Sequence, residues 1–199
     1  MVVKRSYLIP RIVGLVVLAI LFLFFRRTEL LYGSYSDVVR MSDSVISSLK
    51  VKVRQVSSSP PTLAIGVTNA HSSAVTILSW SSPLDPLAVQ LGLLSFTPAG
   101  SDSPVEIPKI MVRRRLPPGP ESLVTIEPGQ TKEQQLELKQ PVVPLDKLQG
   151  KVGVVCQGEW TGVWASKADD IPAESLEKLG LSEDGSRDKF ESQQVEIDI

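Results

Sequence analysis

The balanced charge of this chain argues against recognition by long-range electrostatics. Its 199 residues include 21 Lys and Arg against 22 Asp and Glu, for a formal net charge of -1, whereas nucleic-acid-binding domains usually carry a marked basic excess. A chain of this length has room for one domain with a sizeable core. We therefore expect one globular domain that binds no nucleic acid.

An apolar run near the N-terminus, residues 12–25, contains no polar side chain and is bracketed by Arg11 and by Arg26 and Arg27. Residues 7–10 extend it towards the ~20 residues that a spanning helix needs. The run ends in aromatic and basic residues instead of the small residues of a cleavage site. We predict a transmembrane anchor in the lipid bilayer over residues 1–27, with basic flanks. A cleaved signal peptide and a packed soluble helix are the alternatives.

Residues 28–48 are mixed in character and predict a connector. From Leu49 the hydrophobic period changes to two, with Val51 and Val53 alternating with charged residues, as a half-buried strand requires. Similar short runs follow, separated by turns rich in proline and glycine. Strands are expected over residues 49–54, 63–68, 75–80, 87–96, 105–116, 122–126, 133–138 and 151–164.

Regular spacing of short strands, with hardly any helical periodicity, is typical of a sandwich. We predict an all-β fold, an immunoglobulin-like antiparallel β-sandwich of about seven to eight strands. This domain is expected over residues 49–165, preceded by the hydrophobic helix. Residues 166–199 predict an acidic tail, with a short helix over 171–180 and an edge strand over 194–199.

Residues able to perform catalysis are scarce in this chain. One histidine, His71, cannot supply a two-histidine zinc site, and it stands in a serine-rich turn without a nucleophile-elbow pattern. The single cysteine, Cys156, alternates in step with Val152 and Val154, which is typical of a buried thiol. No glycine-rich phosphate loop or calcium-loop spacing occurs. We predict no enzymatic activity, no cofactor, no metal and no small-molecule substrate.

Two groups of residues are candidates for an interaction surface. Arg113, Arg114 and Arg115 form a basic cluster able to bind an anionic partner, or else an edge strand whose charges prevent aggregation. At least one of these adjacent arginines must point towards the core side of such a strand. Trp160 and Trp164 are expected to share one strand face, as core aromatics or as a contact surface.

Strand-end and turn motifs carry a family resemblance. They are Val67-Thr68-Asn69, Ser82-Pro83-Leu84-Asp85, Val124 to Gln130, Pro144-Leu145-Asp146, Gly150-Lys151-Val152 and Gly158-Glu159-Trp160. On these motifs the stretch from Leu49 to Trp164 resembles a group of small fungal proteins of unknown function. More distantly, it resembles the β-rich pro-region that precedes the catalytic domain of deuterolysin-type metalloproteases. The resemblance implies an immunoglobulin-like domain and carries across no catalytic residue, since the protease half has no counterpart here.

Taken together, these patterns predict a single-pass membrane protein of the secretory pathway, with its domain lumenal or extracellular. Secretion after signal-peptide cleavage is the alternative location. The domain is expected to act as a non-catalytic binding or assembly module for a protein partner that the sequence does not specify. The alternative function is that of a pro-region, which inhibits a protease or assists its folding.

Overall fold

The computed structural model describes residues 45–179 and 188–199, and these belong to one compact unit. The predicted anchor, residues 1–27, and most of the predicted connector, residues 28–48, lie outside the described residues. Within the described ranges, no helix is long and apolar enough to cross a membrane.

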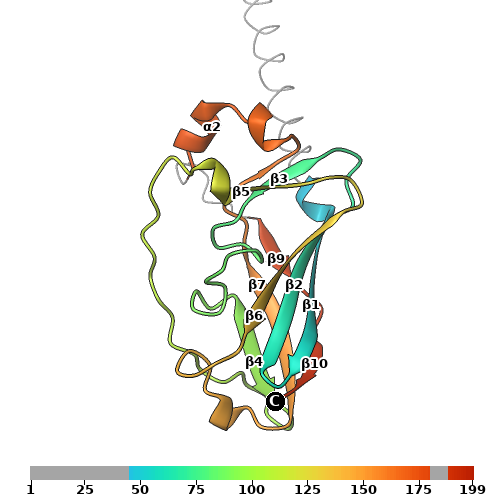
Figure 1. Ribbon diagram of the computed structural model, residues 1–199, viewed down its shortest axis with the longest axis vertical. Coiled ribbons are helices and arrows are strands. Elements are labelled where there is room, and N and C mark those ends of the chain that lie inside the picture. The colour runs from blue at the N-terminus through green and yellow to red at the C-terminus, as the bar shows by residue number, and fades with distance from the viewer. Residues whose placement is uncertain (1–44, 180–187) are drawn as a thin grey trace, which may run out of the picture. The chain divides into compact units, whose positions relative to one another are not determined.

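Ten β-strands in the described residues pair exclusively in antiparallel fashion (Figure 1). The first sheet has the order β1-β2-β6, the second the order β10-β7-β4 with β9 also paired to β7, and the third the order β5-β3-β8. The strands are β1 (Leu49–Ser58), β2 (Pro61–Asn69), β3 (Val75–Leu78), β4 (Leu94–Pro98), β5 (Leu123–Ile126), β6 (Thr131–Glu137), β7 (Lys151–Glu159), β8 (Val163–Trp164), β9 (Lys189–Glu191) and β10 (Val195–Asp198).

Short helical elements occupy the connections between strands. The 3-10 helices are Pro120–Ser122, Leu145–Lys147 and Ala168–Asp170, and the α-helix α2 is Ala173–Glu177. The expected short helix is confirmed by α2. The expected C-terminal edge strand is confirmed by β10, which lies at one end of its sheet.

The hydrophobic pattern explains the positions of β1 and β2. Val51 pairs with Val67 and Val53 with Ile65 in this hairpin. Burial in β1 alternates, because its charged residues face solvent, whereas β2 is nearly continuously buried as the central strand between β1 and β6. A central strand between two partners is expected to have this more apolar sequence.

One hydrophobic core joins the first two sheets. Fully buried side chains of β2, such as Leu63 and Ile65, belong to the same cluster as Phe96 of β4, Val154 of β7 and Ile197 of β10. The all-β, antiparallel prediction is therefore confirmed for the described domain, with ten strands in place of the seven to eight expected.

The strand predicted over residues 105–116 is wrong. These residues form an extended segment with no strand partner, drawn in Figure 1 as an arc that stands apart from the sheets. Proline contributes to this outcome, because Pro108, Pro117 and Pro118 have no backbone N–H for a ladder.

Three further boundaries differ from expectation. The strand predicted over residues 87–96 begins only at Leu94, because residues 87–92 form turns. The strand predicted over residues 151–164 is interrupted after Glu159, so that β7 and β8 belong to different sheets. The domain end predicted at residue 165 is too early, because β9 and β10 both pair with β7. What was expected to be a tail thus supplies two strands of the sandwich.

Candidate binding surface

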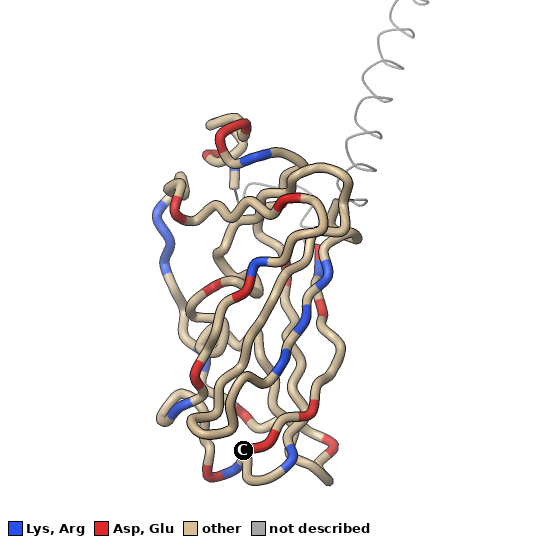
Figure 2. Tube along the Cα trace, turned by 45° about the vertical axis from the view of Figure 1, so that its right-hand side comes forward, with Lys and Arg blue, Asp and Glu red and all other residues tan. Residues whose placement is uncertain are grey.

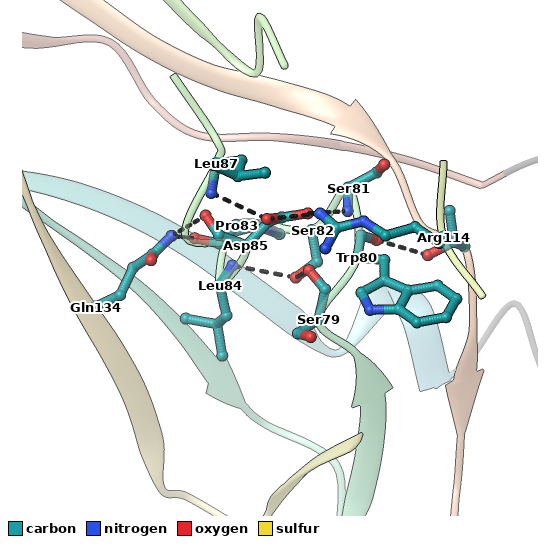
Figure 3. A network of polar contacts seen from close by, with 11 residues as sticks. Ser79, Trp80, Ser81, Ser82, Pro83, Leu84, Asp85, Leu87, Arg114 and Gln134 are labelled. Carbon is teal, nitrogen blue, oxygen red and sulfur yellow. Dashed lines mark hydrogen bonds and ion pairs between the residues drawn. The ribbon is translucent and has the colours of Figure 1, made fainter. Parts of the chain in front are cut away.

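A buried carboxylate lies in the turn-rich loop between β3 and β4. The Asp85 side chain is 1% exposed. Its Oδ2 accepts the backbone N–H of Ser81 at 2.7 Å, and its Oδ1 accepts that of Leu87 at 3.0 Å. Asp85 therefore closes its own loop by bonding backbone groups on both sides of it, as Figure 3 shows.

Arg114 provides the counter-charge from the segment that was expected to be a strand. Its Nη2 donates to Oδ2 of Asp85 at 2.8 Å and to Oδ1 at 3.1 Å. The guanidinium carbon lies 5.7 Å from the ring centroid of Trp80, within the range of a cation–π contact. Of the three adjacent arginines, this one therefore points towards the domain.

Gln134 of β6 completes the network from the first sheet. Its Nε2 donates to the carbonyl oxygens of Pro83 at 2.7 Å and Asp85 at 2.8 Å. Among the described residues, no buried side-chain nitrogen or oxygen lacks a hydrogen-bond partner. The network holds three parts of the chain together: the loop after β3, the segment that carries Arg114, and β6 (Figure 3).

Residues 105–118, which we call the strap, are the segment that this network fixes. The N–H of Val105 donates to the carbonyl of Phe96 at 2.8 Å, and that of Ile110 to the carbonyl of Gln90 at 2.9 Å. Gly92 has a φ of +76°, and a side chain there would collide with the stem of Lys109. The strap is thus attached near its start and again at Arg114.

The outward side of the strap combines apolar and basic side chains. Met111 is fully exposed, and Ile110 and Leu116 are 45% and 51% exposed. Arg113 and Arg115 are also exposed, and no Asp or Glu occurs from residue 107 to residue 119. Figure 2 shows the resulting basic stretch on the arc of the strap. Exposed apolar groups beside like charges are typical of an interaction surface.

The two tryptophans do not belong to this surface and do not share a strand face. Trp160 follows the end of β7, is 5% exposed, and packs against Phe190 with ring centroids 4.8 Å apart. Trp164 is half-buried in β8, where its backbone is paired with that of Thr76. Trp160 is therefore a core aromatic, and the expected shared face is wrong.

Cys156 and His71 both have structural surroundings. Cys156 is fully buried, and burial raises the pKa of its thiol to about 12, so the prediction of a buried thiol is confirmed. His71 belongs to a turn closed by Asn69, whose Oδ1 accepts the His71 N–H at 2.8 Å, while His71 Nδ1 accepts the Ser73 N–H at 3.1 Å. In the described residues, no three Asp, Glu, His or Cys side chains cluster to hold a metal ion.

Sequence reasoning did not identify Asp85 as the residue that positions the strap. A signal was present, because Ser81 to Pro86 reads as a dense turn motif in which an aspartate precedes proline. What could not be read was its partner, since Arg114 is separated from Asp85 by 29 positions.

The Asp85–Arg114 ion pair, which we call the clamp, fixes the strap on the domain. The chain is thus a small β-sandwich that displays an extended segment. Residues 48–199 match the family model of an immunoglobulin-like domain, and the chain belongs to this family. A protein of Arthroderma benhamiae named "Uncharacterized secreted protein" is 27% identical over 174 residues, which cover 82% of this chain and 84% of that protein. The predicted likeness to an immunoglobulin-like fungal protein is thereby confirmed.

Proposed function

We propose that this chain is a non-catalytic binding module whose contact surface is the outward side of the strap. The observation that supports it is the Asp85–Arg114 clamp, which fixes an exposed segment carrying Met111, Arg113 and Leu116. A segment that is already held in one conformation loses little conformational entropy on binding. An immunoglobulin-like sandwich is a frequent scaffold for such surfaces, although the fold alone assigns no partner.

A non-catalytic role is supported by the surroundings of Cys156 and His71, because cysteine is a common nucleophile and histidine a common general base in enzymes. The Cys156 thiol is buried and its pKa is raised to about 12, whereas a reactive thiol needs exposure and a lowered pKa. His71 uses its Nδ1 within its own turn.

We further propose that the domain is exposed to the secretory pathway or the cell exterior. The apolar run of residues 12–25 would deliver it there, either as a membrane anchor or as a cleaved signal peptide. The name of the Arthroderma benhamiae relative, which describes that protein as secreted, supports this route.

Site-specific photo-crosslinking in the producing cells tests the binding module. A photoreactive residue at Met111 should give a discrete crosslinked product, and the substitutions Arg113→Gln and Arg115→Gln together should reduce its yield. The matched control is Val56, which is 42% exposed and belongs to β1 of the first sheet and not to the strap. Equal crosslinking from residues 111 and 56, or none from residue 111, would contradict the proposal.

The resemblance to deuterolysin-type pro-regions supports a second candidate, in which the domain covers a protease or assists its folding. Among its motifs, Ser82 to Asp85 lies in the clamp, and Asn69 ends β2 with its side chain bonded to the turn that follows, so the motifs would preserve the scaffold of such a domain. The full chain should then inhibit a deuterolysin-type metalloprotease. No loss of protease activity at high micromolar concentration would exclude this candidate.

A further inference from the structure

The strap presents backbone groups that have no partner. In the part of the chain that the structure describes, no backbone N–H or carbonyl of residues 111–118 makes a hydrogen bond. Six of these residues, 111–116, precede Pro117 and retain an N–H group. A row of unpaired donors and acceptors on an extended chain is a template for adding another strand.

From residue 111 to residue 115, burial along the strap alternates as it does in a strand. Met111, Arg113 and Arg115 are exposed, whereas Val112 and Arg114 are half-buried. The strap therefore has the side-chain alternation of a β-strand without a neighbouring strand. Because the clamp holds Arg114, the side that faces outward is fixed before any partner arrives.

The charge of the outward side selects among partners. Arg114 is neutralised by Asp85, which leaves Arg113 and Arg115 as the outward charges, with Lys109 preceding them. Like charges directly opposite each other destabilise a strand pair, whereas opposite charges stabilise it. A second strap is therefore repelled and an acidic strand is attracted. Leu116 is also exposed, and by the same alternation it lies on the other face of the strap, with Val112.

We propose that the strap docks an extended acidic peptide segment of a partner protein, which pairs its backbone with residues 111–116. Carboxylates of that segment lie on the same face as Arg113 and Arg115, and its apolar side chains lie on the other face, beside Val112 and Leu116. This inference rests on the proposed binding function and adds the chemistry of the partner.

An anionic membrane surface would also attract Arg113 and Arg115, but it would offer no hydrogen-bond partners for the backbone of the strap. Burial of unpaired N–H and carbonyl groups among lipid tails is costly, because nothing there can bond them. A peptide strand supplies those bonds directly. The backbone of residues 111–116 thus favours the peptide.

Peptide binding to the full chain in non-ionic detergent tests the inference. The probe is an octapeptide of alternating Glu and Val with a fluorophore, and its control alternates Lys and Val. We expect the acidic probe to bind and to slow amide hydrogen exchange in residues 111–116. The changes Arg113→Gln and Arg115→Gln together should weaken binding about threefold to tenfold, as for two exposed ion pairs. The matched control is Lys50→Gln with Lys52→Gln, a pair of basic residues on β1 that are also exposed.

Three outcomes would overturn the inference. In the first, the acidic probe does not bind at millimolar concentration. In the second, the lysine probe binds as well as the acidic probe. In the third, the protein sediments with phosphatidylcholine–phosphatidylserine vesicles in a strap-dependent way but binds no peptide. Crosslinking from residue 111 separates the two proposals. If crosslinking persists while the peptide fails, the binding module stands and the acidic-strand inference falls. If both fail, both proposals fall.

Discussion

Asp85 is the residue on which the position of the strap depends. Its carboxylate accepts two backbone N–H groups and the guanidinium of Arg114 while remaining almost wholly buried. A buried charge is tolerated only when it is paired and fully hydrogen-bonded. Removal of Arg114 therefore leaves the buried Asp85 carboxylate without its counter-charge. Removal of Asp85 leaves Arg114 and two backbone N–H groups of the loop without their acceptor.

We expect Asp85→Ala to lower the free energy of unfolding by about 3–5 kcal/mol, the usual effect of breaking a buried pair. Arg114→Ala should also destabilise the domain, and the double substitution should cost less than the sum, with a coupling of about 1–3 kcal/mol. Urea unfolding of the four proteins measures this cycle. Arg54→Ala is the control, because the Arg54–Glu133 pair is exposed and its loss should change stability little. Additive effects of Asp85→Ala and Arg114→Ala would contradict the clamp.

The raised pKa of Cys156 makes a pH-dependent prediction. Burial keeps the thiol neutral in the folded state and raises its pKa from 9.0 to about 12. Its contribution to stability is complete below the unfolded pKa and is lost as pH rises towards the folded pKa, because only the unfolded chain ionises in that window. The loss should be about 1.4 kcal/mol per pH unit. Urea midpoints at about pH 8 and about pH 10.5 measure it.

Cys156→Ala is the comparison for this pH series. The variant retains every other titrating group, so any difference in slope between the two proteins belongs to the thiol. The variant leaves a small cavity whose cost does not change with pH. Parallel pH profiles of wild type and variant would show that the thiol contributes nothing in this range.

At the residue scale, sequence reasoning identified groups whose environment follows from periodicity. Cys156 could be predicted as buried because its phase matches that of Val152 and Val154. The inward turn of one arginine also followed from alternation. The pairing of Arg114 with Asp85 could not be predicted in this way, since a contact between distant loops depends on tertiary folding that no local pattern encodes.

At the element scale, β10 shows that the C-terminus is part of the sandwich. Its residues pair with β7 in the register Val195 to Val154 and Ile197 to Val152, and Ile197 is 1% exposed. The alternation of residues 194–199 made this strand predictable. The place of β10 in the domain was not predictable, because the acidic residues before it suggested a solvated tail. The pairing partners of a strand are set by the whole fold.

We expect Ile197→Ala to lower the free energy of unfolding by about 2–5 kcal/mol, as for other large-to-small changes in a core. Val195→Ala serves as the control, because Val195 lies on the same strand but is only half-buried, and its cost should be smaller. Urea denaturation measures both. An unchanged midpoint for Ile197→Ala would mean that residues 166–199 are an independent tail after all.

The strap is the element for which the sequence pattern was misleading. Residues 105–116 have the apolar content of a strand, but prolines at 108, 117 and 118 remove donors on both sides of the basic cluster. The buried ion pair then draws Arg114 to Asp85. The result is strand-like alternation without a ladder, and this combination leaves the backbone available to a partner.

At the scale of the whole domain, a side chain joins the edges of two sheets. The amide of Gln55 donates to the carbonyl of Asp198 at 2.7 Å and accepts the Asp198 N–H at 3.0 Å, which imitates a strand pair between β1 and β10. Such closure reduces the number of open edges available to unwanted pairing. Sequence spacing could predict the sandwich class, but not that its sheets are joined in this way.

The role of residues 12–25 is tested on the whole chain. We expect a C-terminally tagged protein to stay in the membrane pellet after alkaline carbonate extraction and to retain its N-terminal residues, because the run should remain in the bilayer as an anchor. Leu18→Arg places a charge near the centre of the run, where it costs about 2.5–3.5 kcal/mol on insertion scales, and should reduce that fraction. Leu8→Arg, in the extension that precedes the run, is the control and should have a smaller effect, because an arginine near the end of a span reaches the headgroups. Recovery in the medium of a protein that begins after Arg27 would instead establish the cleaved signal peptide.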